Sequence, residues 1–346
     1  MDKLKLLVLY GGISAEHDVS IKSARELSQN LDAAKYDPIY VYIGRDGVWR
    51  LGSFPGEESQ NGAVVAPSTD RKNKGLVVLK EERYELLPVD VAFPMLHGKY
   101  GEDGTVQGIL KMSGIPYVGC GIAASALCMD KSLTYLAVAE AGVRVPRHKV
   151  LFQNEKITAG DLQYPLFVKP ARSGSSFGVN KVCKPASLPA AVRAALAYDD
   201  KVLLEEAVIG SEVGCAVMGN GSHLFTGALD QIELSGGFFH IHQEAKPEQG
   251  SENATIRVPA PIPEAARALA VETAKTVYRA LGCRGLARVD LFLTPDGQVV
   301  LNEVNSMPGF TSYSRYPRMM AAAGITLREV IDRLITLALE IGGDAE

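Results

Sequence analysis

Residues 286–305 contain the pattern that most restricts how this chain of 346 residues can fold. Residues 286–293 (LARVDLFL) alternate in the way that is typical of a half-buried β-strand. Residues 294–297 (TPDG) are a strong turn signal, and residues 299–305 (VVLNEVN) again have a strand pattern. The segment therefore predicts an antiparallel hairpin.

Polar side chains of this hairpin are predicted to share one face. If Thr294 and Gly297 close the turn, Arg288 lies opposite Glu303 and Asp290 lies diagonal to it. The strand period of two keeps Asn305 on the same face as Glu303. Carboxylate and amide oxygens suit Mg²⁺ that is held jointly with substrate phosphates. The alternative is a salt-bridged, solvent-exposed face, which is the commoner outcome for an isolated hairpin.

The residues after the second strand favour the metal interpretation. Residues 302–309 (NEVNSMPG) run from the strand into a Pro-Gly turn. Such a turn can present backbone N–H groups to a developing oxyanion.

The rest of the chain alternates strand and helix patterns, which predicts an α/β protein of two or three domains. In the first part we expect buried parallel strands at residues 5–10, 39–43 and 89–93, and a helix that begins after Ser20 as its N-cap. These elements form a small open sheet that ends near residue 122, with residues 44–74 as a surface excursion. Further along we expect helices at 125–141, 188–196, 264–281 and 327–339, and strands at 166–170, 179–182, 202–206, 214–218 and 223–232. Residues 235–253 are polar and aperiodic, as in a lid or a disordered loop.

Composition excludes some partners. The net charge of −4 gives no reason to expect nucleic acid or a membrane surface. No apolar run is long enough to cross a bilayer, and the first residues (MDKLKLLVLY) lack a secretory pattern. We expect a cytoplasmic protein whose five cysteines are reduced, buried and inert: Cys120, Cys128, Cys183, Cys215 and Cys283.

The common nucleotide-binding fingerprints are absent, so any nucleotide must be held by other residues. Residues 174–178 (GSSFG) lie between two strand patterns and could cradle phosphate, although a plain hairpin turn is the commoner meaning. Lys131 and Lys169 could contact phosphates or be merely solvated. Glu205 and Glu212 have a spacing that could bracket a base and a ribose.

Six motifs in order give these features a family context. They are residues 16–20 (EHDVS), 97–104 (HGKYGEDG), 129–131 (MDK), 169–178 (KPARSGSSFG), 288–290 (RVD) and 302–318 (NEVNSMPGFTSYSRYPR). In these motifs the chain resembles D-alanine–D-alanine ligases and their close relatives, the D-alanine–D-lactate ligases of vancomycin resistance. The resemblance runs from the first strand to about Leu339. It implies an ATP-grasp fold of three domains: an N-terminal α/β domain at 1–122, a central ATP-binding subdomain at 123–212, and a C-terminal catalytic domain at 213–346 that carries the lid 235–253.

For the substrates, the resemblance implies a role for each matching position. Glu16 would hold the ammonium group of the first D-alanine, with His97 nearby. Arg288 and the N–H of Gly309 would stabilise the tetrahedral intermediate. Ser314 would take the carboxylate of the second substrate.

For the nucleotide, the resemblance implies that Lys131 and Lys169 contact the phosphates of ATP. Ser175 and Ser176 would lie in the loop that closes over the substrates. The adenine and ribose would be met by four neighbouring residues: Glu205, Glu206, Val208 and Glu212. Two Mg²⁺ ions, for which Mn²⁺ could substitute, would be held by the hairpin residues Asp290, Glu303 and Asn305.

The acceptor is indicated by residues 238–244 (FFHIHQE). This stretch resembles the lactate-adding branch, in which the histidine matching His242 is associated with a hydroxy-acid acceptor, and Arg315 follows Ser314 as in that branch. A cationic His242 would repel the ammonium of D-alanine by about 4 kcal/mol at about 4 Å and an effective dielectric constant near 20. It would not repel the hydroxyl of D-lactate. The alternatives are that His242 is only a surface residue of the lid, or that residues 233–239 (ELSGGFF) mark a serine-adding relative.

The sequence therefore predicts an enzyme that uses ATP to activate D-alanine as an acyl phosphate and joins it to D-lactate, for altered peptidoglycan precursors in glycopeptide resistance. Ligation of D-alanine to D-alanine or D-serine is the nearest alternative. A nucleotide-binding regulator without catalysis is disfavoured because the predicted metal face is intact. By resemblance, a homodimer is possible.

Overall fold

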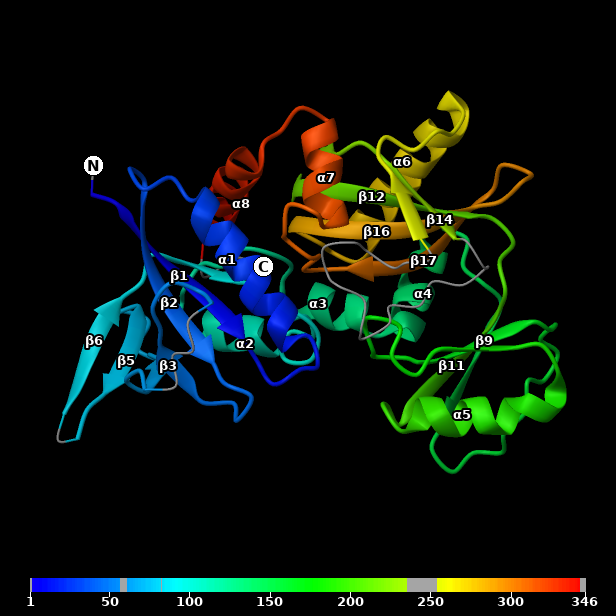
Figure 1. The fold of residues 1–346 in the computed structure, drawn as a ribbon, viewed down its shortest axis with the longest axis horizontal. Helices are drawn as coiled ribbons and strands as arrows, with labels where there is room; N and C mark the ends of the chain where they lie inside the picture. The colour runs from blue at the N-terminus through cyan, green and yellow to red at the C-terminus, as the bar shows by residue number, and fades with distance from the viewer. Residues whose placement is uncertain (1, 57–60, 82, 235–253, 343–346) are drawn as a thin grey trace.

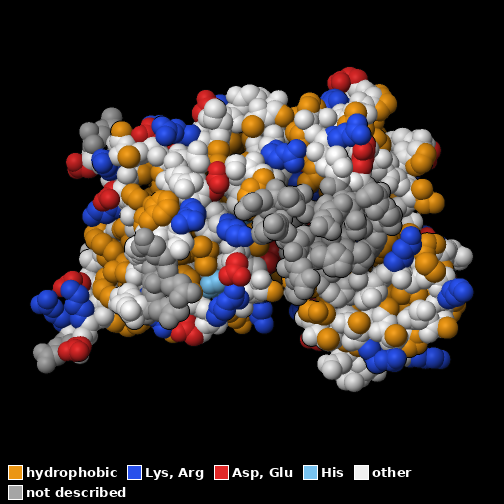
Figure 2. Space-filling model, viewed as in Figure 1, with side chains coloured by type: hydrophobic (Ala, Val, Ile, Leu, Met, Phe, Trp, Pro, Cys, Tyr) orange, Lys and Arg blue, Asp and Glu red, His pale blue; other side chains and the backbone are white. Residues whose placement is uncertain are grey.

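The computed structural model describes residues 2–56, 61–81, 83–234 and 254–342. Its strands form four sheets, and helices cover their faces (Figure 1). In Figure 1 the N-terminal strands lie on the left, the sheet that contains β12 lies at the upper right, and β9 and β11 lie at the lower right. On the face shown in Figure 2, basic and acidic side chains of the described residues are interspersed.

The N-terminal sheet has the order β3-β2-β1-β7. Its strands are β1 (Leu4–Gly11), β2 (Tyr36–Ile43), β3 (Trp49–Leu51) and β7 (Val91–Pro94). β1 runs parallel to β2 and β7, and its central residues 6–10 are buried. The three predicted strands are confirmed, because a continuous apolar run suits a strand that is covered on both faces.

Helix α1 (His17–Asn30) begins earlier than predicted. Ser20 is not its N-cap: the side chain is buried within the helix, accepts a hydrogen bond from Gly11 N (2.8 Å) and donates one to the carbonyl of Met95. Glu16 takes the N-cap position without a side-chain capping bond. The hydroxyl therefore joins α1 to the ends of β1 and β7.

The sequence analysis missed a small antiparallel sheet with the order β4-β5-β6. It is formed by β4 (Val65–Pro67), β5 (Gly75–Leu79) and β6 (Tyr84–Pro88). Helix α2 (Thr105–Met112) follows β7 after a loop rich in glycine.

The helix predicted at 125–141 is two helices, α3 (Ile122–Met129) and α4 (Lys131–Glu140), which meet at 109°. Asp130 has an extended backbone and caps α4 by accepting from the N–H groups of Ser132 and Leu133. Lys201 binds the same carboxylate at 2.9 Å. The break places Lys131 in the first turn of α4.

The next sheet has the order β10-β9-β11-β8 and is antiparallel throughout. Its strands are β8 (His148–Phe152), β9 (Leu166–Pro170), β10 (Asn180–Val182) and β11 (Lys201–Glu206). A short 3₁₀ helix, η1 (Pro185–Ser187), leads into α5 (Leu188–Leu196), which packs on β9. The predicted elements of this region are confirmed.

The largest sheet has the order β15-β14-β12-β16-β17, with β13 paired to β12. Its strands are β12 (Ser211–Asn220), β13 (His223–Thr226), β14 (Asp230–Leu234), β15 (Ala254–Arg257), β16 (Gly285–Leu293) and β17 (Val299–Asn305). The single strand predicted at 223–232 is thus divided into β13 and β14. The predicted lid, residues 235–253, lies outside the described residues.

Helices cover this sheet on both faces. α6 (Glu264–Ala280) packs against β12 and β16 on one face, and α7 (Arg315–Ala322) and α8 (Leu327–Ile341) contribute to the other. α8 also contacts α1 and β7, so one hydrophobic core joins it to the N-terminal sheet.

The acidic hairpin is confirmed, but its predicted register is wrong. Leu293 pairs with Val299, and a β-bulge after Asp290 leaves Asn302 as the extra residue. Arg288 therefore faces Asn305, and Asp290 faces Glu303 directly. The bulge brings the two carboxylates closer in register than the regular hairpin would.

Two further expectations are tested by burial and helix length. All five cysteines are free, and four are buried, but Cys183 is exposed. Among the described residues no single helix is long and apolar enough to cross a membrane, and α3 with α4 meets that test only as a sharply bent pair.

Candidate active site

The predicted metal residues lie together on β16 and β17. Arg288 Nε donates to both carboxylate oxygens of Asp290 (2.9 and 3.0 Å), and Arg288 NH2 donates to Oδ2 at 2.8 Å. Asn305 Nδ2 donates to the same Oδ2 at 3.1 Å. Asp290 is almost fully buried, so its charge is balanced by neighbouring side chains rather than by water.

Glu303 faces two lysines. Lys131 Nζ lies 3.3 Å from Glu303 Oε2 and donates to the carbonyl of Ser173 at 2.9 Å. Burial alone would raise the pKa of Glu303, but Lys131, Lys169 and Arg288 together lower it to about 2. This carboxylate is therefore ionised at neutral pH and can act as an oxygen ligand.

Lys169 and Glu205 form a buried ion pair beside the metal face. Lys169 Nζ lies 2.7 Å from Glu205 Oε2, and both side chains are less than a tenth exposed. The hydroxyl of Tyr135 lies 2.9 Å from Glu205 Oε1 and 2.8 Å from the carbonyl of Asn302. Tyr135 thus connects α4 to β11 and to the bulge of β17.

Arg315 brings three carboxylates together. Its guanidinium binds Asp230 through two hydrogen bonds (2.7 and 2.8 Å) and Glu212 through one (3.1 Å), and it lies 3.2 Å from Asp290 Oδ1. Burial raises the pKa of Glu212 to about 7, against the opposing effect of Arg315. Glu212, which is predicted to meet the ribose, is therefore linked through Arg315 to Asp290 on the predicted metal face.

The glycine-serine loop reaches across to the N-terminal sheet. Ser175 Oγ–H donates to Glu16 Oε1 at 2.6 Å. Ser175 and Ser176 both adopt left-handed backbone conformations, with φ of 50° and 57°. Gly98 and Gly174 pass close to the Glu16 carboxylate, and a Cβ at Gly98 would lie 2.5 Å from Oε2. The loop therefore closes on the residue predicted to hold the donor ammonium.

His97 is buried, and both of its ring nitrogens have partners. Nδ1 donates to the carbonyl of Met307 at 3.1 Å, and Nε2 accepts from Ser23 Oγ at 3.0 Å. Burial lowers the pKa of His97. A neutral ring that makes these bonds holds the loop before Gly309 in place.

Glu102 was part of a matched motif but had no predicted role. Its carboxyl accepts from Gly98 N (2.7 Å) and from Met307 N (3.1 Å), so it joins two loops that are 205 residues apart in sequence. Burial first, and then the nearby charge of Glu16, raises the pKa of Glu102 to about 8. Only the tertiary structure reveals this contact.

The residues predicted to meet the acceptor, Gly309 and Ser314, lie close together; we call them the acceptor end of the site. A Cβ at Gly309 would lie 2.9 Å from Ser314 Oγ, so the loop passes close to that hydroxyl. Ser314 Oγ lies 2.6 Å from Thr311 Oγ1 and accepts from Thr311 N at 3.3 Å. Ser314 is the N-cap residue of α7, directly before Arg315.

Some predicted residues stand apart from this cluster. The side chain of Glu206 accepts from Arg147 (2.8 Å) and its backbone N–H donates to the Arg147 carbonyl (2.9 Å). Val208 is half-buried in the connection between β11 and β12. Ser176 is exposed. His242 lies outside the described residues.

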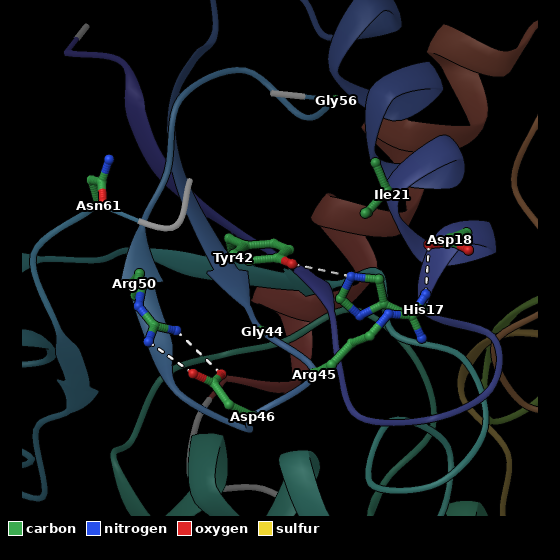
Figure 3. Close-up of a pocket in the computed structure, with 10 residues that line it drawn as sticks. All are labelled: His17, Asp18, Ile21, Tyr42, Gly44, Arg45, Asp46, Arg50, Gly56 and Asn61. Carbon is green, nitrogen blue, oxygen red and sulfur yellow. Dashed lines mark hydrogen bonds and ion pairs between the residues drawn. The ribbon is translucent and has the colours of Figure 1, made fainter. Parts of the chain in front are cut away.

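Two cavities lie in the N-terminal part rather than at the charged cluster. The larger, about 630 Å³, lies between α1 and strands β2 and β3. Figure 3 shows that its charged side chains are paired, Arg50 with Asp46 and Arg45 with Asp18. The smaller, about 280 Å³, has His97 and Gly12 in its wall. The side-chain cluster, and not the larger cavity, contains the predicted residues and is therefore the candidate catalytic site.

Comparison with known families decides the assignment. The family model described as D-ala D-ala ligase N-terminus matches residues 5–120, and the model described as D-ala D-ala ligase C-terminus matches residues 134–336. The chain belongs to the D-alanine–D-alanine ligase family. It has the ATP-grasp fold of that family and is an ATP-dependent ligase.

Individual relatives cover nearly the whole chain. A putative D-alanine–D-lactate ligase of Streptomyces coelicolor is 58% identical over 98% of this chain and 99% of its own length. Vancomycin B-type resistance protein VanB of Enterococcus faecalis is also 58% identical, over 98% of this chain and all of its own length. Among solved structures, the VanG D-Ala:D-Ser ligase from Enterococcus faecalis is 41% identical, with a TM-score of 0.88 over 98% of this chain and 100% of that one.

Proposed function

We propose that this enzyme joins D-alanine to D-lactate at the expense of ATP and so makes the depsipeptide used in altered peptidoglycan precursors. The observation that carries the proposal is 58% identity, over 98% of the chain, to a putative D-alanine–D-lactate ligase. The same degree of identity to the resistance protein VanB supports a place in glycopeptide resistance. The reaction would take place in the cytoplasm, and a homodimer is compatible with the family.

The nucleotide would bind where lysines now neutralise carboxylates. Lys131 and Lys169 are paired with Glu303 and Glu205. Phosphate oxygens would compete for the same ammonium groups and would leave the two glutamates free for other partners. Glu205 and Glu212, with the backbone of 206–208, would then meet the adenine and the ribose.

The oxygen donors of the hairpin fit Mg²⁺. The described residues contain no group of three His, Cys, Asp or Glu side chains arranged for a metal ion, so the set depends on two carboxylates and one amide. Asp290 and Glu303 are register partners, and Asn305 contacts Asp290. Hard oxygen donors of this kind, completed by phosphate, are what Mg²⁺ requires. When bound, two Mg²⁺ ions would neutralise charge on the phosphates.

The first chemical step would form D-alanyl phosphate. Glu16, held by Ser175, would bind the ammonium group and direct the D-alanine carboxylate towards the γ-phosphate of ATP. A carboxylate oxygen forms a bond to phosphorus as the bond to the β-phosphate oxygen breaks, and ADP leaves. The closed glycine-serine loop would exclude water that otherwise hydrolyses the acyl phosphate.

In the second step the hydroxyl of D-lactate would attack the acyl carbon. The new ester bond forms as the carbon–oxygen bond to phosphate breaks, and the hydroxyl proton ends on the inorganic phosphate that leaves. Arg288 and the N–H of Gly309 would stabilise the oxyanion of the tetrahedral intermediate. Ser314 would bind the carboxylate of D-lactate.

The acceptor has one serious alternative. The likeness to the VanG D-Ala:D-Ser ligase, at 41% identity, favours D-serine as the second candidate. Both acceptors have a hydroxyl and a carboxylate, but D-serine and D-alanine also carry an ammonium group. A protonated His242 would disfavour that group, and this is the residue on which we propose that selection depends.

Product analysis tests the proposal. The purified enzyme is given ATP, Mg²⁺, D-alanine and an equimolar mixture of D-lactate and D-serine, and the products are identified by mass spectrometry at pH 7. We expect D-alanyl-D-lactate to exceed both dipeptides. A product mixture dominated by D-alanyl-D-serine or D-alanyl-D-alanine would replace the proposed acceptor.

The same reaction tests whether the protein is instead a regulator without catalysis. Formation of ADP that depends on D-alanine supports the ligase. ATP binding without such ADP formation would favour the regulator.

A further inference from the structure

We propose that Asp230 is a positioning residue for the acceptor end of the site. It holds Arg315 and thereby fixes Ser314, which precedes Arg315, relative to the metal face. This inference rests on the proposed function, since it assigns to Ser314 the binding of the acceptor carboxylate. Asp230 is not among the residues that the sequence motifs identify.

The contact between Asp230 and Arg315 is buried and has a defined geometry. Asp230 is completely buried at the start of β14. Its Oδ2 accepts from Arg315 Nε (2.7 Å), and its Oδ1 accepts from Arg315 NH2 (2.8 Å) and from Gly214 N (2.9 Å). A two-point arginine–carboxylate contact fixes orientation as well as distance. Burial would raise the pKa of Asp230, but Arg315 holds it below the ordinary value, so the pair is ionic.

The backbone of β12 passes directly against this cluster at Gly214. A Cβ at Gly214 would lie 2.4 Å from Arg315 NH2, 2.5 Å from Asp230 Oδ1 and 3.1 Å from Asp290 Oδ1. The guanidinium therefore lies directly on the backbone of β12, between carboxylates of β14 and β16. With Glu212 it links residues predicted to meet the ribose, the metal and the acceptor.

Arg315 is the first residue of α7, and this makes its anchoring relevant to Ser314. Three further contacts join α7 to the same sheet: Tyr316 Oη donates to Val217 O (3.1 Å), Ala228 N donates to Met319 O (2.9 Å), and Arg318 Nη2 donates to Ile256 O (3.2 Å). Arg315 is the residue next to Ser314, and Asp230 accepts two of its side-chain hydrogen bonds. Loss of these bonds would let the Arg315 side chain shift while the other contacts keep α7 on the sheet.

The position of Arg315 beside Asp290 explains why its side chain must be fixed. Arg315 lies 3.2 Å from Asp290 Oδ1, so it can compete with a cation for that oxygen. The guanidinium of Arg315 donates two hydrogen bonds to Asp230, and these hold it against the backbone of β12. The pair thus fixes where this positive charge lies beside Asp290 of the predicted metal face.

Steady-state kinetics of Asp230→Asn test the proposal. Asparagine keeps the shape but removes the charge and one acceptor oxygen, so we expect the KM for the acceptor to rise about tenfold or more. The KM for ATP should rise less than the KM for the acceptor, because Arg315 keeps its hydrogen bond to Glu212, the residue predicted to meet the ribose. The acceptor is whichever one the wild-type enzyme uses, so that failure of D-lactate as substrate does not decide this test.

Two controls make the result specific. Asp332→Asn removes one carboxylate from an ion pair with Lys35 (2.6 Å), outside the cluster, and should leave both KM values unchanged. In an Arg315→Met background, Asp230→Asn should add no further increase in acceptor KM, because the group that it positions is gone. If Asp230→Asn does not fold, as judged by circular dichroism, Asp230→Glu keeps the charge and should show the same selective effect.

An acceptor KM that is unchanged in the folded Asp230 variant would overturn the proposal. Equal increases in the KM for ATP and acceptor would also overturn it, because they would indicate a general disturbance of the cluster. Additive effects of the Asp230 and Arg315 substitutions would show that Asp230 does not act through Arg315.

Discussion

Replacing Ser175 by alanine should weaken the binding of the donor D-alanine. Ser175 Oγ–H donates to Glu16 Oε1 at 2.6 Å, in a partly buried position. A hydrogen bond to a charged group contributes about 1.5–3 kcal/mol, which corresponds to a roughly 10- to 150-fold change in affinity. Partial exposure of both groups places the expected effect near the lower limit, so we expect about a tenfold increase in the KM for D-alanine.

The backbone of Ser175 provides a second variant that separates two effects. Its φ of 50° is left-handed, which costs a residue with a Cβ about 1–2 kcal/mol. Ser175→Gly loses the hydroxyl but relieves this strain, while glycine adds backbone entropy to the open loop at about 0.5–1 kcal/mol. The two variants should therefore differ from each other by only about 1 kcal/mol, with glycine the milder change.

The assay is the initial rate against D-alanine concentration at saturating ATP and D-lactate. Ser176 provides the matched control, because its φ is 57° and its Oγ makes no hydrogen bond within the described part of the chain. Ser176→Ala should leave the KM for D-alanine close to the wild-type value. The reasoning would be refuted if Ser175→Ala had the same KM for D-alanine as the wild type. It would also be refuted if Ser176→Ala raised that KM as much as Ser175→Ala does.

Further outcomes concern three other residues. Tyr135→Phe should lower the free energy of unfolding by about 1.5–3 kcal/mol, because Glu205 loses a buried donor, and urea denaturation compared with the exposed-site variant Tyr198→Phe measures this. Glu102 has a folded pKa of about 8, above its ordinary 4.5, so its contribution to stability declines as pH rises from 4.5 to 8. Between pH 5 and 8 the melting temperature of Glu102→Gln should thus change less than that of the wild type; parallel curves would contradict this. His242→Ala should abolish most ester formation while ATP binding persists, and in the wild type the ratio of peptide to ester should rise above about pH 8 as His242 loses its proton. A ratio that stays flat from pH 6 to 9, measured by mass spectrometry, would exclude that role.

Local patterns in the sequence predicted most of the strands and the polar side chains that lie together on the hairpin. The hairpin at 286–305 was predictable because strand alternation and a Pro-Asp-Gly turn are local signals. The register of the hairpin could not be predicted. The bulge adds Asn302 to β17, and no glycine or other sequence signal marks that position. The break between α3 and α4 was missed for a similar reason: helix propensity continues through Asp130, and the capping contact and Lys201 decide the bend.

Residues that act through tertiary contacts could not be predicted from local sequence patterns. No local pattern indicates the contacts of Glu102 and Asp230, because their partners Met307 and Arg315 lie 205 and 85 residues away. The connection between β5 and β6 lacks a turn signal, since charged residues rather than glycine or proline join these two strands. The proposed division into domains at 122 and 212, and the roles of the individual site residues, stay predictions.

The central claim is that Asp290, Glu303 and Asn305 hold the cations that accompany the phosphates of ATP. Anomalous diffraction from crystals grown with Mn²⁺ and a non-hydrolysable ATP analogue measures this directly. We predict manganese peaks about 2.0–2.3 Å from oxygens of all three side chains, with Arg288 and Lys131 moved from their present partners. Nucleotide density without a metal peak between β16 and β17, and with Asp290 still bound to Arg288, would contradict the claim.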